Sequence, residues 1–242
     1  LFAVAEGLPI HIFGSGIQAK SIYDFHDNVK EGDCYLDNDP YIGNTHAADH
    51  TFLVPVFLEG EHIFTAVAKA HQADIGNSLP TTYMAKAKDI YEEGALIFSA
   101  VKIQENYKMI DDVIRMMKKR IRVPSQWYGD FLAGISAVRI AEKRLKEMCK
   151  KYGLKIIKQF ISDWLKYSEK RMIQEIKKLP SRKLYNNSFH DPTPFLSKGI
   201  PLEIKLNINN EKKLIEIDLR NNIDCVECGY NQSEATATSS VI

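Results

Sequence analysis

The stretch that decides the fold is LDNDPYIGNTHAADHTFLVPVFLEGEHIFTAVAKAHQADIG, residues 36–76. It contains two apolar runs, at residues 51–57 and 63–69, which are separated by the short segment LEGE. A short break with a glycine between two such runs is typical of a β-hairpin. We therefore predict that residues 51–69 form two antiparallel strands around a tight turn.

The predicted register gathers three metal-ligand residue types at the base of this hairpin. A turn centred between residues 59 and 60 places His71 opposite residue 48, so His46, Asp49 and His71 should converge. Two imidazoles and a carboxylate on rigid strand ends suit a divalent metal with open coordination positions, and Zn²⁺, Mn²⁺ and Fe²⁺ all accept this set. A second interpretation stays open, in which the three residues only bond the backbone at the hairpin base.

Two aspartates near the hairpin are candidates for catalytic roles. Asp74 could be a further ligand, could orient an imidazole, or could act as a general base. Asp39 precedes Pro40 in the segment DNDP and could contact the substrate, although an Asx turn is an equal alternative. His11 is interpreted as a core histidine on a strand.

Other residues of this region have alternative interpretations as well. His50 and His62 fall on or beside the strands and are interpreted as ordinary strand-face residues. An aromatic substrate pocket is an alternative to core packing for the residues Tyr83, Tyr91, Trp127 and Tyr128.

The rest of the chain alternates between strand and helix patterns. Alternation or short apolar runs predict strands at 9–14, 34–36, 202–208 and 214–219. Helical spacing predicts helices at 17–30, 110–119, 126–152 and from about 154 to 179, with Ser125 as the cap of the third. We predict a mixed α/β (α+β) fold with β-hairpins around the metal site, a helical middle segment and a C-terminal antiparallel hairpin of a larger sheet. The predicted regions are a β-rich metal-site region at 1–100, a helical region at 101–180, and at 181–242 a polar connector followed by the start of a β region.

The distribution of charge separates the first two regions. Residues 1–100 carry 5 basic and 14 acidic side chains, a net −9, and residues 101–178 carry 20 basic and 9 acidic ones, a net +11. The acidic part suits cation binding. The basic part is best interpreted as solvated helix faces, with docking to an acidic partner as the alternative.

Composition and missing motifs exclude several classes of protein. The 242 residues, 45% hydrophobic and 26% charged, can bury a sizeable core and contain no apolar run that predicts a membrane span. Four scattered cysteines favour a reducing, cytoplasmic compartment. Phosphate-loop and dinucleotide motifs are absent, and the basic region lacks the interleaved aromatics of a nucleic-acid platform. The first residues do not resemble a signal peptide, and we expect the chain to be part of a longer polypeptide.

Several segments together resemble the hydantoinase B/oxoprolinase family. They are GDCYLDNDPYIGNTHAADHTFLVPVF at 32–57, AKAHQADIGNSLP at 68–80, DIYEEGAL at 89–96, IRVPSQWYGDFLAG at 121–134 and DLRNNIDCVECGYNQSEATATSSVI at 218–242. That family includes catalytic subunits of N-methylhydantoinases, 5-oxoprolinase domains, and acetone and acetophenone carboxylases. The sequence is most similar to the acetophenone carboxylase branch, and it covers only part of a family member.

The resemblance implies a specific ligand set. In the metal-containing carboxylases of the family, a T-H-x-x-D segment and a downstream G-H or A-H-x-x-D segment supply the ligands, which correspond here to His46, Asp49 and His71. Ala70 stands where acetone carboxylases have glycine, and Asn44 stands where many hydantoinases have a second glycine. These departures leave the metal and the reaction type open.

The resemblance also implies a partner and two possible reactions. Family members work with an ATP-binding subunit or domain of the sugar-kinase/actin-like type, here a hydantoinase A-like subunit in a hetero-oligomer. ATP would phosphorylate the amide or enol oxygen of a small-molecule substrate, and the metal-bearing subunit would then promote hydrolysis of a cyclic amide or carboxylation of a ketone. A third alternative is a non-catalytic assembly subunit that docks through its basic helical region.

Overall fold

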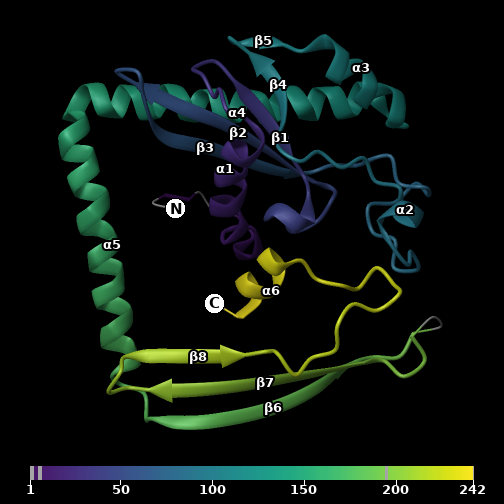
Figure 1. The fold of residues 1–242 in the computed structure, drawn as a ribbon, viewed down its shortest axis with the longest axis vertical. Helices are drawn as coiled ribbons and strands as arrows, with labels where there is room; N and C mark the ends of the chain where they lie inside the picture. Colours follow the sequence, from purple (N-terminus) through teal and green to yellow (C-terminus); the bar gives the residue numbers. More distant parts are fainter. Residues whose placement is uncertain (1–2, 5–6, 194–195, 242) are drawn as a thin grey trace. The chain divides into compact units, whose positions relative to one another are not determined.

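The computed structural model describes residues 3–4, 7–193 and 196–241 (Figure 1). It contains two compact units, Ala3–Gly153 with Gly229–Ile242 and Leu154–Cys228. The divisions between these units fall after Gly153 and after Cys228. The regions expected at 1–100, 101–180 and 181–242 stay a prediction. Antiparallel sheets and long helices in one chain confirm the predicted mixed α/β fold class.

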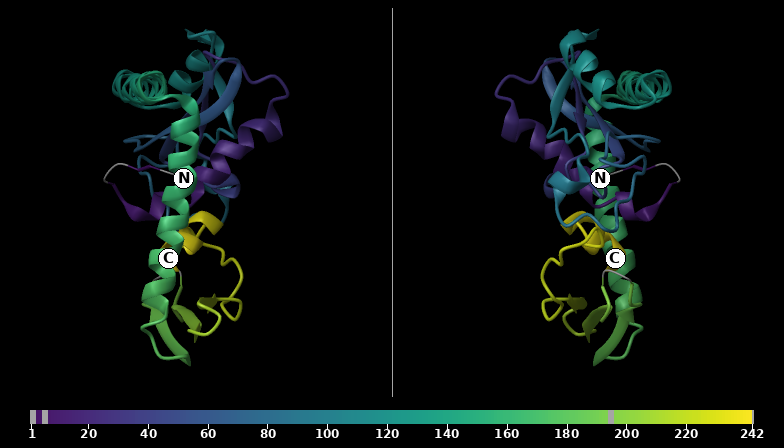
Figure 2. Two further views of the ribbon diagram at one scale, coloured as in Figure 1. Left: turned by 90° about the vertical axis from the view of Figure 1, so that its left-hand side faces the viewer. Right: turned by 90° about the vertical axis from the view of Figure 1, so that its right-hand side faces the viewer.

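The first unit is built on a five-stranded antiparallel sheet with the order β3-β2-β1-β4-β5. Its strands are β1 (Cys34–Asp37), β2 (Asp49–Leu58), β3 (Glu61–His71), β4 (Val101–Glu105) and β5 (Lys108–Met109). The first eight residues of β2 are all buried, because helices cover both faces of the sheet at this strand. Figure 2 shows these two helices, α1 (Gly14–Phe25) and α4 (Pro124–Tyr152), on opposite faces.

The remaining helical segments of this unit are short. They are η1 (Pro9–His11), η2 (Pro40–Ile42), α2 (Ile90–Glu93), α3 (Asp111–Arg120) and α6 (Glu234–Val241). The strand predicted at 9–14 is wrong, because Pro9 opens a 3₁₀ turn and α1 begins at Gly14. The predicted Ser125 cap is also wrong. The helix begins one residue earlier at Pro124, whose fixed φ and missing N–H suit the first helical position.

Helix α4 approaches the sheet closely at Gly134. A Cβ at this position would lie 2.2 Å from Cε2 of Phe52, so only glycine fits without a shift. The Phe52 ring packs edge-on against Phe131 of the same helix, with 5.6 Å between ring centroids. This contact fixes α4 over β2, on the face opposite to α1.

The predicted hairpin between β2 and β3 is confirmed, but its register differs by one residue. Asp49, and not residue 48, pairs with His71. The difference arises at an irregularity between Val56 and Phe57, where the register shifts near the turn. A one-residue slip moves every side chain to the other face of a strand. The bulge therefore places Asp49 and His71 directly opposite each other on one face.

The second unit consists of α5 (Leu154–Ile176) and a three-stranded antiparallel sheet. The strands are β6 (Arg182–His190), β7 (Ile200–Asn209) and β8 (Leu214–Asp218). The predicted hairpin of β7 and β8 is confirmed, whereas the predicted connector at 181–200 contains strand β6.

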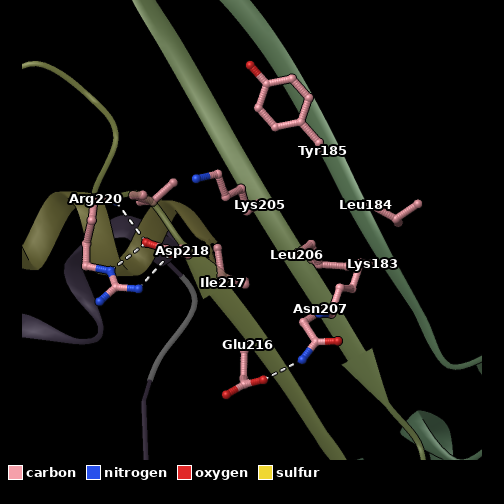
Figure 3. A pocket seen from close by; sticks show the side chains of 11 residues that line it. Lys183, Leu184, Tyr185, Lys205, Leu206, Asn207, Glu216, Ile217, Asp218 and Arg220 are labelled. Carbon is pink, nitrogen blue, oxygen red and sulfur yellow. Dashed lines mark hydrogen bonds and ion pairs between the residues drawn. The ribbon is translucent and has the colours of Figure 1, made fainter.

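The sheet of the second unit has one polar face. Tyr185, Lys205 and Asp218 form one row across the three strands, and they are among the residues that line the hollow in Figure 3. Arg220 donates to both carboxylate oxygens of Asp218 at 2.8 Å. No helix in the described part of the chain is both long and apolar enough to cross a membrane.

Candidate metal centre

The structure brings His46, Asp49 and His71 together at one end of the hairpin. His46 lies in the loop before β2, Asp49 is the first residue of β2, and His71 is the last residue of β3. One possible ligand atom from each residue lies within 4.8 Å of the other two. The sequence predicted this set, and residues far apart in the chain form it through the pairing of β2 with β3.

The hydrogen bonds of the cluster define which atoms face each other. Nδ1 of His71 lies 2.8 Å from Oδ1 of Asp49, and Nε2 of His71 lies 3.2 Å from the hydroxyl of Thr82. An ionised carboxylate only accepts, so His71 donates to Asp49 through Nδ1. Nδ1 of His46 accepts the backbone N–H of Ala48 at 3.0 Å.

Electrostatics favour a neutral imidazole at His46. Burial lowers the pKa of His46, while the carboxylate of Asp49 opposes this effect. Neutral imidazoles and a carboxylate are the forms that bind a divalent ion such as Zn²⁺ or Mn²⁺. His46, Asp49 and His71 would hold such an ion, which would supply Lewis acidity to the site. The donor set and its spacing therefore fit the metal site that the sequence predicts.

The side chain of Asn44 holds both the loop of His46 and the start of β2, where Asp49 lies. Asn44 is fully buried, and its amide donates to the carbonyl oxygens of His46 at 2.5 Å and Asp49 at 2.9 Å. Its Oδ1 accepts from Gln18 and Thr51, each at 3.3 Å. The asparagine that departs from the family pattern thus stabilises the loop through side-chain hydrogen bonds.

A buried polar row lies next to the cluster on the same face of the sheet. Asp37, Thr51 and Lys69 occupy neighbouring positions across β1, β2 and β3. Burial raises the pKa of Asp37 to about 7, although hydrogen bonds from Asp39 N–H and the Gln18 amide act in the opposite direction. Burial lowers the pKa of Lys69 to about 8. Nζ of Lys69 is buried without a hydrogen-bond partner among the described residues.

The two aspartates predicted as catalytic lie outside the group of three. Oδ1 of Asp74 accepts from the Arg122 guanidinium and from Gly76 N–H, both at 3.0 Å. Asp39 accepts the N–H of Tyr41 at 2.9 Å, which caps η2, and the hydroxyl of Ser99 at 2.6 Å. Both carboxylates hold loops in this structure, and their catalytic roles stay predictions.

Two further residues lie beside the cluster, namely Tyr83, which is a candidate for an aromatic substrate pocket in the sequence, and His11, which the sequence analysis assigns to the core. The ring of Tyr83, 66% exposed, lies 4.1 Å from His46 and 5.9 Å from His71 by ring centroids. His11 Nδ1 lies 2.8 Å from the Thr45 hydroxyl, which donates to Asp49 at 2.9 Å. No local pattern could reveal these contacts, because His11 lies in a different segment of the sequence.

His50 follows Asp49 in the sequence but lies on the opposite face of β2. Its ring is buried against Phe98 and Trp127, in edge-on contacts. Burial lowers the pKa of His50 to about 3. The interpretation of His50 as a strand-face residue outside the ligand set agrees with this position.

Comparison with known proteins places the chain in a family. The family model of hydantoinase B/oxoprolinase matches residues 1–242. The B-type subunit of a putative D-/L-hydantoinase from Pseudomonas sp. (strain NS671) is 35% identical over 212 residues, which cover 87% of this chain and 35% of that protein. The beta-type subunit of the caprolactamase from Pseudomonas jessenii is 32% identical and covers 72% of this chain and 30% of that protein. A 5-oxoprolinase of Dictyostelium discoideum is 30% identical over 88% of this chain and 17% of that protein.

Two solved structures share the fold. The ATP-dependent caprolactamase from Pseudomonas jessenii superposes with a TM-score of 0.89 at 25% identity and covers 96% of this chain and 40% of that one. A nucleotide-free acetone carboxylase superposes with a TM-score of 0.88 at 18% identity, over 98% of this chain and 33% of that one. The chain spans well under half of each of these relatives. It belongs to the hydantoinase B/oxoprolinase family.

Proposed function

We propose that the chain is the metal-binding catalytic part of an ATP-dependent enzyme that hydrolyses a cyclic amide. The observation that carries the proposal is the convergence of His46, Asp49 and His71 within 4.8 Å. The relatives named hydantoinase, caprolactamase and 5-oxoprolinase support a cyclic amide as the substrate class.

The residues of this chain would hold the ion and organise its surroundings. When bound, a divalent ion supplies Lewis acidity to the site or lowers the pKa of a water molecule. Asp49 and His71 start from paired strand ends, which gives the ligands a rigid base, and Asn44 fixes the loop of His46. In this proposal Asp74 and Asp39 act on protons or substrate from their hydrogen-bonded positions.

The ATP-dependent step belongs to a partner in this proposal. Two of the relatives are named as single components of enzymes with more than one kind of subunit, which supports a hydantoinase A-like ATPase partner and a hetero-oligomer. That partner would phosphorylate the amide oxygen of the substrate, because O-phosphorylation makes the amide carbon more electrophilic. Water could then add to this carbon, and the ring would open by cleavage of the C–N bond. We also propose a cytoplasmic location, in agreement with four free cysteines.

Carboxylation of a ketone is the second candidate function. The observation in its favour is the similarity of several segments to the acetophenone carboxylase branch, whereas the likeness to acetone carboxylase at 18% identity shows the fold alone. A non-catalytic assembly subunit is the third candidate.

Reconstitution with the hydantoinase A-like partner tests the proposal. ATP hydrolysis is measured with a hydantoin, 5-oxoproline or caprolactam, and separately with acetone or acetophenone plus bicarbonate. We expect ring opening coupled to ATP hydrolysis, and its loss in His46→Ala. Turnover only with a ketone and bicarbonate would replace hydrolysis by carboxylation. Partner binding without metal and without either turnover would identify an assembly subunit.

A further inference from the structure

A chain of hydrogen bonds leads from the 3₁₀ turn η1 to the carboxylate of Asp49. Nδ1 of His11 lies 2.8 Å from Oγ1 of Thr45, and this hydroxyl lies 2.9 Å from Oδ2 of Asp49. His11 itself lies 3.9 Å from that oxygen, which is too long for a hydrogen bond. Thr45 is therefore the direct partner of Asp49, and His11 acts on Asp49 through Thr45.

The direction of each bond follows from the number of protons. An ionised carboxylate only accepts, so the single hydroxyl proton of Thr45 points to Asp49. His11 must then donate to the threonine oxygen through Nδ1–H, which fixes its tautomer. The other carboxylate oxygen of Asp49 faces His71 at 2.8 Å. Each oxygen of Asp49 thus has its own fixed partner, and rotation of the carboxylate would break both bonds.

The residues that form these hydrogen bonds are themselves held in place. The side chain of Asp49 is 6% exposed and that of His11 is 26% exposed, so water competes little at the Asp49 end. The Thr45 carbonyl accepts the hydroxyl of Thr236 in α6 at 3.2 Å, and the His11 carbonyl accepts the hydroxyl of Ser15 at 3.0 Å. Segments from both ends of the sequence therefore fix these hydrogen bonds of His11, Thr45 and Asp49, which we call the relay.

We propose that His11 and Thr45 are positioning residues that orient Asp49 for metal binding. Thr45 holds Oδ2 of Asp49 and keeps Oδ1 on the side of His71, while His11 holds the Thr45 hydroxyl in the donating orientation. The inference rests on the metal site proposed above. Partners that orient a metal ligand typically contribute 10–100-fold in affinity.

The test is a titration of the 242-residue chain with Zn²⁺ and with Mn²⁺ against a competing chelator. Thr45→Val keeps the branched shape but removes the hydroxyl, and we expect a loss of affinity on the order of 10-fold or more. Thr45→Ser keeps the hydroxyl and should restore most of the affinity. His11→Leu should weaken binding less than Thr45→Val, whereas His11→Asn retains an N–H donor at the corresponding position and should bind nearly as well as the wild type.

A double variant separates positioning from independent effects. Because His11 acts through Thr45, Thr45→Val combined with His11→Leu should bind the metal no more weakly than Thr45→Val alone. Thr65→Val is the matched control, since Thr65 also bonds a histidine, His62, at 3.1 Å on the same hairpin. It lies on the order of 20 Å along β3 from His71, so its variant should bind metal as the wild type does.

Two kinds of result overturn the inference. Wild-type affinity in a folded Thr45→Val, together with loss of metal in His46→Ala, refutes the relay and leaves the metal site intact. A wild-type chain that binds neither ion refutes the metal site and the relay together.

Imidazole ¹⁵N spectra of chelator-treated protein give a readout that needs no metal. His11 should be the Nδ1–H tautomer, and an Nε2–H tautomer contradicts the relay.

Discussion

Replacing Asp37 by asparagine should change how the stability of the protein depends on pH. Asp37 is fully buried beneath α1, where it accepts hydrogen bonds from Asp39 N–H at 2.8 Å and from the Gln18 amide at 3.1 Å. Burial raises its pKa from the ordinary value of 3.8 to about 7. The same Gln18 amide reaches Asn44, so this carboxylate belongs to the network that holds the metal loop.

The sign and size follow from the two pKa values. At pH values between 3.8 and about 7, Asp37 has lost its proton in the unfolded chain but still holds it in the folded chain. The contribution of Asp37 to the free energy of unfolding therefore falls as pH rises. Each unit of pKa difference corresponds to about 1.4 kcal/mol. Between about pH 4.5 and about pH 7, the wild type should therefore lose about 3 kcal/mol relative to Asp37→Asn. Constant effects of the substitution cancel in this comparison.

Urea unfolding at the two pH values, with chelator present, measures the difference. Asp24→Asn removes an exposed carboxylate from helix α1, which covers Asp37, and is the matched control for the loss of a carboxylate. Parallel profiles for the wild type and Asp37→Asn would refute the reasoning, because they would show that Asp37 ionises at the same pH in both states.

Two further predictions concern packing and thiol reactivity. Gly134→Ala should destabilise the fold by about 1–3 kcal/mol, because the added Cβ overlaps with Phe52. Gly129→Ala in the same helix meets nothing within 4 Å and should stabilise the fold by up to about 1 kcal/mol. Urea unfolding measures both variants, and a stabilised Gly134→Ala would contradict the close packing. The exposed Cys225 should react with a thiol reagent in the native protein. Cys34 is buried, which raises its pKa to about 12, and it should react only after unfolding. Equal reaction rates for the two thiols would contradict the burial of Cys34.

The core of the site could be predicted from the sequence because it depends on a hairpin. Two apolar runs around the turn at Gly60 determine which strands pair, and pairing brings Asp49 to His71. The bulge between Val56 and Phe57 could not be predicted, since both residues are ordinary strand formers. It corrects the register by one residue and thereby places the aspartate, and not its neighbour, opposite the histidine.

Other elements were missed because tertiary contacts outweigh the local pattern. Strand β6, RKLYNNSFH, is polar and contains adjacent asparagines, and it forms a strand through its pairing with β7. The segment around His11 alternates like a strand, yet Pro9 opens a 3₁₀ turn there. That turn gives His11 its place beside Thr45, a contact across 34 positions that no spacing rule covers.

The metal content of the chain tests the central claim most directly. Equilibrium dialysis against Zn²⁺, Mn²⁺ and Fe²⁺ followed by elemental analysis should find about one ion per wild-type chain. His62→Ala is the control and should bind the same amount, because the imidazole of His62 bonds Tyr23 away from the cluster. His46→Ala and His71→Ala should each lose that ion. Undiminished stoichiometric metal in both variants, or none in the wild type, would contradict the assignment of His46, Asp49 and His71 as the metal site.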